Sequence, residues 1–194
     1  EYYLTDLVDY ASKRQVKIGS TQTREKEVLG ANNKEELAAL YEALISLNVK
    51  EAKRKGVIFK DESTCYVEGT LKVGKDVQIG NNVTIKGSVK LGNNVSIESN
   101  VVLSNVKIGE NSIVKDFCSI ENSLIAKNVE VGPFARLRNG AVLDDSAKVG
   151  NFVEVKQTKV GAGSKVNHHA YLGDTKIGKK VNIGAGTITC NYDG

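Results

Sequence analysis

An aliphatic residue followed by glycine recurs along most of this sequence, and its spacing constrains the fold more than any other feature. The intervals are mostly multiples of six, or one short of that. Further aliphatic residues, such as Ile85, Ile97 and Val155, continue the same register. The pairs are Val73-Gly74, Ile79-Gly80, Leu91-Gly92, Ile108-Gly109, Val131-Gly132, Val149-Gly150, Val160-Gly161, Leu172-Gly173, Ile177-Gly178 and Ile183-Gly184. A fixed period of this kind indicates a repeat architecture.

The six-residue unit predicts a short strand with one inward aliphatic side chain, followed by a corner at Gly or Asn. Residues with a Cβ adopt such corner conformations reluctantly. Three units close a triangular coil of about 18 residues, and stacked coils pair their backbones about 4.8 Å apart. We therefore expect a β-helix of hexapeptide repeats from about Val73 onward. An antiparallel sandwich would instead show turn signals at wider intervals with irregular loops, which the six-residue period contradicts.

The composition agrees with an aliphatic core, because the chain has no Trp, four Phe and seven Tyr. The net charge of +4 is carried by dispersed lysines, and no aromatic residues are interleaved with basic ones. This favours solvated outer faces over a nucleic-acid surface, while a small anionic ligand stays compatible. Three distant cysteines indicate neither a disulfide framework nor a metal site, and a reducing cytoplasm is expected. We expect no membrane span and no export signal.

The first seventy residues follow a different pattern. Asn32 and Asn33 precede an acidic first turn, which is typical of a helix N-cap. Apolar residues then follow at helical spacing, and Gly56 ends the pattern. The sequence therefore predicts a connecting helix of about 20 residues, whose apolar residues are Leu37, Leu40, Tyr41, Leu44 and Ile45.

Four segments of the repeat region are specific enough to indicate a family: GPFARLR (132–138), VGNFVEVK (149–156), HHAYLGD (168–174) and NIGAGTITCNYDG (182–194). They resemble one family of bifunctional bacterial enzymes, the glucosamine-1-phosphate N-acetyltransferases / N-acetylglucosamine-1-phosphate uridyltransferases. With EYYLTD at the start and GANN before the helix, the resemblance covers the whole chain. It implies a mainly β fold, a left-handed parallel β-helix, whose hand departs from the usual right-handed crossover rule.

The resemblance also implies a domain organisation. Residues 1–34 correspond to the C-terminal end of a uridyltransferase (pyrophosphorylase) domain of α/β type, and residues 35–55 to a helical linker. Residues 56–194 correspond to the β-helix acetyltransferase domain. Because the sequence starts without Met and stops inside a motif, we expect a fragment whose acetyltransferase domain is incomplete at its C-terminal end.

The activity implied by the resemblance is acetyl transfer from acetyl-CoA to the amine of glucosamine 1-phosphate. In the full-length enzyme a UTP-dependent uridylyl transfer with Mg²⁺ then gives UDP-N-acetylglucosamine, a precursor of peptidoglycan and lipopolysaccharide. The family also implies a cytoplasmic homotrimer. Because the glycine-rich nucleotide loop is absent from the sequence, this chain alone should not transfer uridylyl groups. Two alternatives stay open: a non-catalytic β-helix scaffold, and an acetyltransferase for another amino sugar.

Transfer to an amine requires a base, because an amine at neutral pH is mostly protonated. The sequence has two histidines, His168 and His169, which should point to opposite sides of a strand. The resemblance assigns the base to His168 and leaves His169 passive. Glu154 is the candidate to hold the far nitrogen of His168, which would fix its tautomer. The alternative for Glu154 is a solvated strand residue without a catalytic role.

Binding a sugar phosphate requires cations, and the family's phosphate-binding positions match Arg138 and Lys156. The two residues are eighteen positions apart, the length of one coil, so we expect them on the same face of adjacent coils. Arg136 is the rival of Arg138. These expectations combine the motif with the spacing of the repeat.

The remaining assignments come from the resemblance alone. Tyr171 and Asn182 would hydrogen-bond the sugar phosphate, and Ala185, Asn191 and Tyr192 would contact acetyl-CoA. Cys190 lies beside this group, but direct transfer without an acyl-cysteine is expected. Asn32 matches a position that helps to hold Mg²⁺ and the nucleotide sugar, and its alternative role is helix capping.

Overall fold

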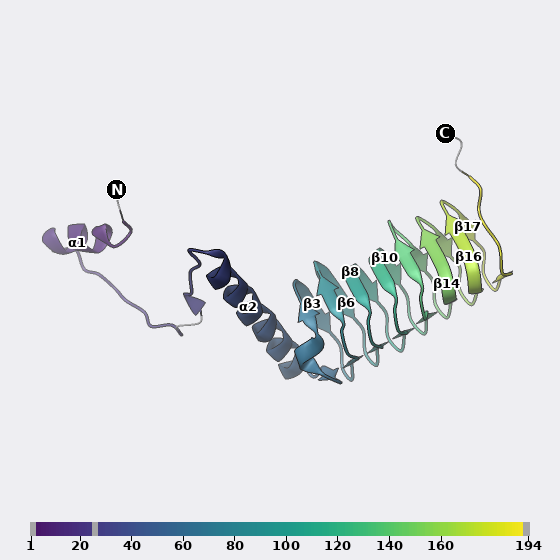
Figure 1. Ribbon diagram of the computed structural model, residues 1–194, viewed down its shortest axis with the longest axis horizontal. Coiled ribbons are helices and arrows are strands. Elements are labelled where there is room, and N and C mark those ends of the chain that lie inside the picture. The colour runs from purple at the N-terminus through teal and green to yellow at the C-terminus, as the bar shows by residue number, and fades with distance from the viewer. Residues whose placement is uncertain (1–2, 25–26, 192–194) are drawn as a thin grey trace. The chain divides into compact units, whose positions relative to one another are not determined.

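The computed structural model describes residues 3–24 and 27–191. Contacts divide the chain into two compact units, Glu1–Ala43 and Leu44–Gly194, and each unit is described by itself. The first unit holds α1 (Asp6–Lys13) and the start of α2 (Lys34–Arg54) (Figure 1). No helix in the described residues is long and apolar enough to cross a membrane.

The N-terminus of α2 is closed by reciprocal hydrogen bonds. The Glu36 backbone N–H donates to Asn33 Oδ1 at 2.8 Å, and the Asn32 backbone N–H donates to Glu36 Oε2 at 2.7 Å. The first bond makes Asn33 the N-cap, which satisfies a backbone donor that a helix start leaves unpaired, and the second bond ties Glu36 to the residue before the cap. The predicted helix is confirmed within one residue at each end, and Asn32 takes part in its cap.

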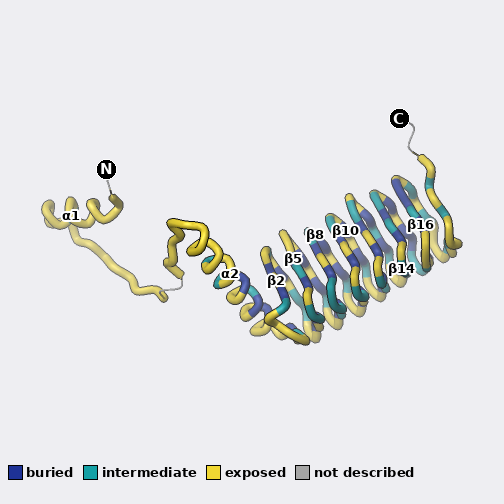
Figure 2. The backbone as a smooth tube through the Cα atoms, in the orientation of Figure 1, coloured by how far each residue is buried: buried dark blue, intermediate teal, exposed yellow. Residues whose placement is uncertain are grey.

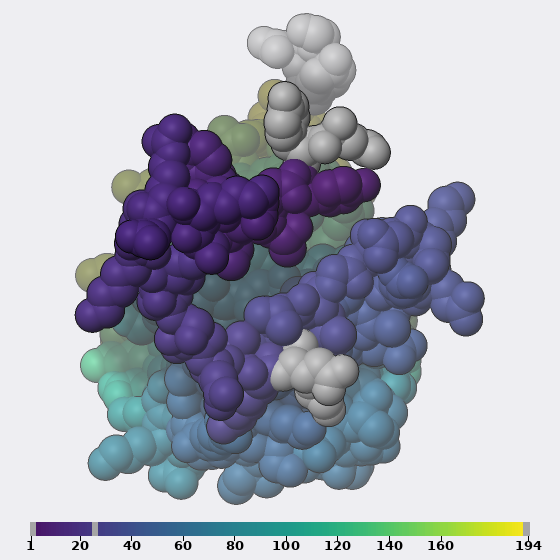
Figure 3. Space-filling model, turned by 90° about the vertical axis from the view of Figure 1, so that its left-hand side faces the viewer, coloured from purple at the N-terminus to yellow at the C-terminus, as the bar shows by residue number. Residues whose placement is uncertain are grey.

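The last turns of α2 belong to the second unit and cover the first coil. Ile45, Val49 and Ala52 are buried at helical spacing. The side-chain amide of Asn48 donates to the carbonyl of Val67 at 2.8 Å. Figure 3 looks at this end of the unit and shows atoms of the first coils, in blue, next to those of the helix. The helix therefore caps the end of the repeat array, where a coil has no preceding neighbour.

The second unit is a parallel β-solenoid of about seven turns. A short 3₁₀ helix, η2 (Glu62–Thr64), follows the first strand. The strands are β1 (Ile58–Phe59), β2 (Tyr66–Val67), β3 (Thr70–Val73), β4 (Gln78–Ile79), β5 (Thr84–Lys86), β6 (Ser88–Leu91), β7 (Ser96–Ile97), β8 (Val102–Ile108), β9 (Ile113–Val114), β10 (Ser119–Ile125), β11 (Glu130–Val131), β12 (Arg136–Arg138), β13 (Val142–Leu143), β14 (Lys148–Lys156), β15 (Lys159–Val160), β16 (Lys165–Gly173), β17 (Lys176–Ile177) and β18 (Asn182–Ile183).

The strand pairing defines three faces of the solenoid. The first face joins β1, β4, β7, β9, β11, the start of β14, the start of β16 and β18. The second joins β2, β5, the start of β8, the start of β10, β12, the end of β14 and the end of β16. The third joins β3, β6, the end of β8, the end of β10, β13, β15 and β17. Three strands per coil confirm the predicted β-helix.

From β2 onward the register between coils takes two values, seventeen and eighteen positions, whereas the first pairing, Ile58 with Gln78, is twenty positions apart. Gln78 pairs with Ser96, a step of eighteen positions, and Ser96 pairs with Ile113, a step of seventeen. The variation explains why the aliphatic-glycine pairs in the sequence are sometimes one residue short of a multiple of six. Corners absorb the difference without moving inward side chains to the outside.

Each face contributes a column of aliphatic side chains to the core, and Figure 2 shows the resulting alternation of buried and exposed positions. In the second face every residue of the column is 1% exposed or less, and no aromatic side chain is buried among the described residues. This confirms the aliphatic core. The column consists of Val67, Ile85, Leu103, Ile120, Leu137, Val155 and Leu172.

The corners carry the unusual backbone conformations. Many corner residues have positive φ, and Asn, which tolerates this region best, is the commonest of those that are not glycine. Their amides bond along the axis, as from Asn94 Nδ2 to Asn111 Oδ1 at 3.0 Å. Gly150 shows a second constraint, because a Cβ there would lie 1.8 Å from the carbonyl oxygen of Asn167 in the next coil.

Truncating one side chain of the inner column should destabilise the solenoid. Leu103 is fully buried, so Leu103→Ala should cost about 2 to 5 kcal/mol of unfolding free energy. The control is Val102→Ala on the same strand, because Val102 is 39% exposed and should change stability by about 0.5 kcal/mol or less. Urea unfolding followed by circular dichroism compares the two. Equal midpoints for both variants would contradict the inward assignment of Leu103.

Candidate active site

The predicted phosphate-binding residues lie on the second face, where β12, β14 and β16 run side by side. Arg138 pairs with Lys156, and Lys156 pairs with Gly173. The eighteen-residue spacing therefore places Arg138 and Lys156 in adjacent coils on one face, as the sequence predicts. Both side chains point outward, because the residue before each of them, Leu137 or Val155, is buried in the core.

Two carboxylates hold these two cations. Arg138 Nε donates to Glu154 Oε1 at 2.6 Å, and Lys156 Nζ lies 2.9 Å from Asp174 Oδ2. The hydrogen bond to Glu154 raises the pKa of Arg138, and the hydrogen bond to Asp174 raises the pKa of Lys156. All four side chains are about one quarter to one third exposed, or slightly more. The result is a partly shielded group of two permanent cations and two carboxylates, whose charges balance.

Asp174 was missed by the sequence reasoning. It closes the HHAYLGD segment, directly after β16, and its φ of 49° places it at a corner. An acidic residue one coil after Lys156 was the available signal, because 156 and 174 are eighteen positions apart. Arg136, the rival of Arg138, is exposed, and its Cα partner is Glu154. The ion pair with Glu154 distinguishes Arg138 from Arg136.

The contact expected between Glu154 and His168 is not formed. The Cα partner of His168 is Asn151, whereas Glu154 pairs with Tyr171. The fourteen positions from Glu154 to His168 fall short of one coil, which takes seventeen positions here. The structure records no hydrogen bond between Glu154 and His168, both of which lie in its described part, and the Glu154 carboxylate faces Arg138 instead. A role for Glu154 in catalysis stays a prediction.

The two histidines do not alternate as neighbours in a flat strand would. His169 has a φ of 48° and forms a corner between the first and second faces, so the strand turns there. Both side chains are exposed, and their rings meet edge to face with centroids 6.5 Å apart. The prediction that they point to opposite sides of a strand is therefore wrong. His168 is the last residue of β16 on the first face, and Tyr171, three residues later, lies on the second face.

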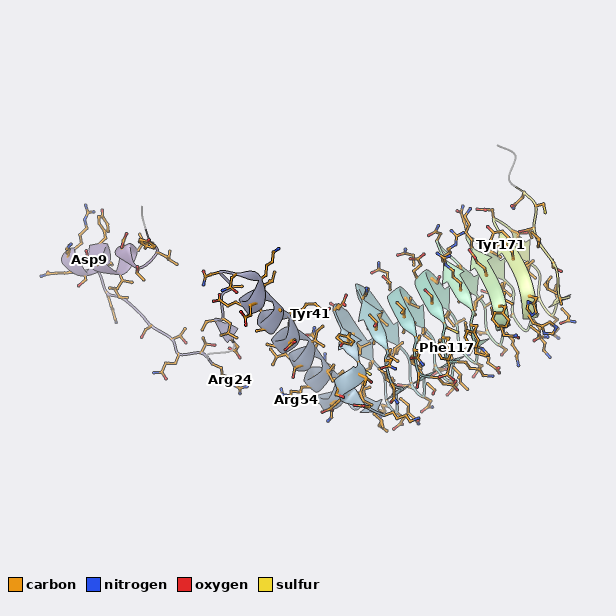
Figure 4. The ribbon with its side chains drawn as sticks, viewed as in Figure 1. Asp9, Arg24, Tyr41, Arg54, Phe117 and Tyr171 are labelled. Carbon is orange, nitrogen blue, oxygen red and sulfur yellow. The ribbon has the colours of Figure 1, made fainter. Side chains whose placement is uncertain are left out.

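Tyr171 lies beside the cation group. Its ring passes over Gly173, where a Cβ would lie 2.7 Å from the hydroxyl oxygen. After the dominant effects of their carboxylate partners, Tyr171 also contributes to the raised pKa of both Arg138 and Lys156. Figure 4 labels Tyr171 among the last coils of the solenoid. The structure thus brings together Arg138, Lys156, Glu154 and Tyr171, with His168 around the adjacent corner.

The other predicted residues are more dispersed. Asn182 pairs with Lys165 on the first face, so it does not join the cation group. Ala185 is exposed in the segment that follows β18. This segment passes the corner formed by His169, because the Gly186 N–H donates to the His169 carbonyl oxygen at 2.7 Å. Asn191 Nδ2 donates to the carbonyls of Gly173 and Asp174 at 2.8 and 3.0 Å. Tyr192 lies outside the described residues.

The structure gives Asn32 a structural partner. Its side-chain amide donates to Glu36 Oε2 at 3.2 Å within the helix cap. Among the described residues no group of three or more His, Cys, Asp or Glu side chains could hold a metal ion. The Mg²⁺ assignment of Asn32 stays a prediction.

Comparison with known proteins identifies the relatives of this chain. Residues 52–155 match the family model described as the EIF2B subunit epsilon LbH domain. Over its full length the chain is 46% identical to the Bifunctional protein GlmU of Acinetobacter baumannii (strain AYE) and 47% identical to that of Nitrosomonas eutropha. It spans 43% of the length of these two relatives.

Solved structures of acetyltransferases resemble the chain at low sequence identity. The acetyltransferase domain of PglB from Neisseria gonorrhoeae matches with a TM-score of 0.43 at 14% identity, over 61% of this chain and 58% of that one. A mutant of perosamine N-acetyltransferase from Caulobacter crescentus, in complex with CoA and GDP-perosamine, matches with a TM-score of 0.45 at 18% identity. That match covers 74% of this chain and 62% of the other.

Removing the partner of Lys156 should change its titration. Asp174→Asn removes the negative charge and replaces the charge-assisted hydrogen bond by a neutral one, so the pKa of Lys156 should fall. The measurement is an NMR titration of the Lys156 side-chain carbon next to Nζ. Asp144→Asn is the control, because Asp144 instead pairs with Lys159, at 3.2 Å. An unchanged Lys156 titration in Asp174→Asn would show that the ion pair does not form in solution.

Proposed function

The chain belongs to the family described as the EIF2B subunit epsilon LbH domain, and on this premise we propose that it transfers an acetyl group from acetyl-CoA to the amine of glucosamine 1-phosphate. The observation that carries the proposal is the stacking of Arg138 over Lys156 beside Tyr171, with His168 at the neighbouring corner. Cations at a fixed separation suit the phosphate of a sugar phosphate. The histidine at the neighbouring corner supplies the base that an amine nucleophile needs.

The proposed reaction begins with a proton transfer. A neutral imidazole of His168 takes a proton from the ammonium group of the amino sugar, and the freed amine attacks the thioester carbon of acetyl-CoA. The carbon–sulfur bond then breaks, and the leaving sulfur takes up the proton that the nitrogen loses as the amide forms, so CoA leaves as a thiol. The exposed Cys190 has no step in this sequence, because the amine attacks the thioester directly.

The proposed role of Arg138 and Lys156 is to hold the phosphate. In the described structure Arg138 bonds Glu154 through Nε, so its two Nη groups remain to donate to phosphate oxygens. Lys156 can donate to a phosphate oxygen while it keeps its hydrogen bond to Asp174, because an ammonium has three donors. The carboxylates then keep both cations in place before the substrate arrives.

The remaining contacts complete the proposal. Tyr171 and Asn182 hydrogen-bond the sugar phosphate, and Ala185, Asn191 and Tyr192 contact acetyl-CoA. The Asn191 amide nitrogen is occupied by two backbone carbonyls, which leaves its Oδ1 to accept a hydrogen bond. Glu154 acts in catalysis through Arg138, whose guanidinium it orients.

For the full-length protein we propose a second activity and a cellular role. The word bifunctional in the relatives' name and the resemblance of residues 1–34 support UTP-dependent uridylyl transfer with Mg²⁺. The product, UDP-N-acetylglucosamine, would serve peptidoglycan and lipopolysaccharide synthesis, and thereby cell-wall biogenesis and cell shape, in the cytoplasm.

Replacing the proposed base should remove acetyl transfer. His168→Ala in the full-length protein should lower kcat about 10² to 10⁴-fold with little change in KM for acetyl-CoA, because general bases contribute about this much. Release of the CoA thiol measures the rate. Lys107→Ala is the control and should leave kcat unchanged, since Lys107 is exposed on the third face, away from the proposed site. Retained activity in His168→Ala would exclude His168 as the base, and a parent protein inactive on glucosamine 1-phosphate would favour a scaffold or another acceptor.

We also propose that the protein is a homotrimer, as the resemblance implies. Triangular solenoids present flat faces that can pack side by side, and a neighbouring copy could then line part of each site. Sedimentation equilibrium of the full-length protein should give three times the chain mass. A monomer at about micromolar concentration, the range in which stable assemblies persist, would contradict this.

A further inference from the structure

Four aromatic rings form a stacked ladder along one corner of the solenoid. Phe117 stacks on Phe134 with ring centroids 4.8 Å apart and planes 3° from parallel. Phe134 stacks on Phe152 at 5.4 Å, and Phe152 stacks on His169 at 5.2 Å. The ladder therefore runs through four consecutive coils and ends on the residue next to His168. Figure 4 labels its first ring, Phe117, at the lower edge of the solenoid.

The rungs of this ladder occupy backbone positions that bulky residues rarely accept. Their φ angles are 60°, 54°, 54° and 48° for Phe117, Phe134, Phe152 and His169. Left-handed backbone costs a residue with a Cβ roughly 1 to 2 kcal/mol. In the two preceding coils the same corner holds Asn82 and Asn100, because the strands that follow these residues are paired in register with the strand after Phe117. Asn tolerates left-handed backbone better than Phe does. Aromatic residues replace Asn at this corner in the coils that lead up to the candidate active site.

Burial does not account for the ladder. Phe117, Phe134 and Phe152 are 52%, 46% and 54% exposed, so they leave about half of each side chain in water. Each stacked pair contributes about 0.5 to 1.5 kcal/mol, which is close to the cost of the left-handed backbone. Stacking by itself therefore roughly offsets the cost of the left-handed backbone. Its effect is to fix the direction of each corner.

The last corner matters most, because it separates the proposed base from the phosphate-binding face. His168 precedes it and Tyr171 follows two residues after it. The ring of His169 is held on one side by Phe152, and its carbonyl accepts the Gly186 N–H at 2.7 Å on the other. The ring of His168 meets that of His169 at an interplanar angle of 69°. Any rotation of the His169 corner would therefore turn His168 relative to Arg138 and Lys156.

We propose that the aromatic ladder positions His168, with His169 acting as a positioning residue through the stack of its ring on Phe152. This inference rests on the proposed function. It assigns His169 no proton transfer, because a flat ring at this corner is sufficient. Phenylalanine should therefore replace His169, as it already forms the other three rungs.

The test compares three changes at His169 and Phe152 in the full-length protein. His169→Asn keeps a residue that accepts the left-handed corner but removes the ring, and Phe152→Asn removes the ring beneath it. Each should lower kcat about 10 to 100-fold without changing KM for acetyl-CoA, because a misplacement of about 1 Å can cost 10²-fold. His169→Phe keeps the stack and should retain kcat within about twofold, since aromatic pairing is preserved. Phe117→Asn is the matched control two rungs away and should leave kcat unchanged.

A second readout needs no substrate. The NMR signals of the His168 ring should shift in Phe152→Asn, which leaves the neighbouring His169 ring in the protein, and should stay near their original positions in Phe117→Asn. Thermal unfolding of each variant confirms that it is folded. This readout decides the positioning of His168 separately, whereas thiol release by the parent protein decides the proposed function.

Three results would overturn the inference. If His169→Phe is as slow as His169→Asn, the imidazole itself is needed. If Phe152→Asn keeps full activity and an unshifted His168 signal, the stack positions nothing. If Phe117→Asn loses as much activity as Phe152→Asn, the ladder acts through general stability.

Discussion

Parallel backbone pairing between coils of nearly constant length is the constraint on which the rest of the structure depends. Each coil hydrogen-bonds only to its neighbours, so the inner column around Leu103 and Ile120 is continuous only if every coil keeps its register. A slip of one residue would exchange inward and outward side chains. The same register that builds the core therefore sets the spacing of functional groups on the outside.

At the candidate active site this constraint produces an unusual electrostatic arrangement. Arg138 and Lys156 are stacked as like charges on adjacent strands, which is unfavourable unless counter-charges lie close by. Glu154 and Asp174 supply them from the same face. The cations are therefore held in fixed positions and remain fully charged. A phosphate that approaches meets donors already oriented, so less ordering is required when it binds.

The six-residue period was sufficient for the β-helix and for the juxtaposition of Arg138 with Lys156, because these depend only on register. The connecting helix followed from its cap and its own helical spacing, and the aliphatic core from the composition. Features at corners were not predictable in the same way. The two histidines were expected to alternate, but the left-handed backbone of His169 interrupts the strand. Glu154 was placed near His168 by counting about one coil, and the actual coil length pairs it with Tyr171. Asp174 was overlooked because it stands at a corner, where the repeat specifies conformation rather than side-chain role.

The measurement that tests the account most directly is a crystal structure of the full-length protein with glucosamine 1-phosphate bound. The account predicts that the phosphate group lies between Arg138 and Lys156 on adjacent coils, within hydrogen-bond distance of both, and that the sugar amine faces His168. A sugar phosphate bound on another face of the solenoid, or a phosphate that contacts neither Arg138 nor Lys156, would contradict it.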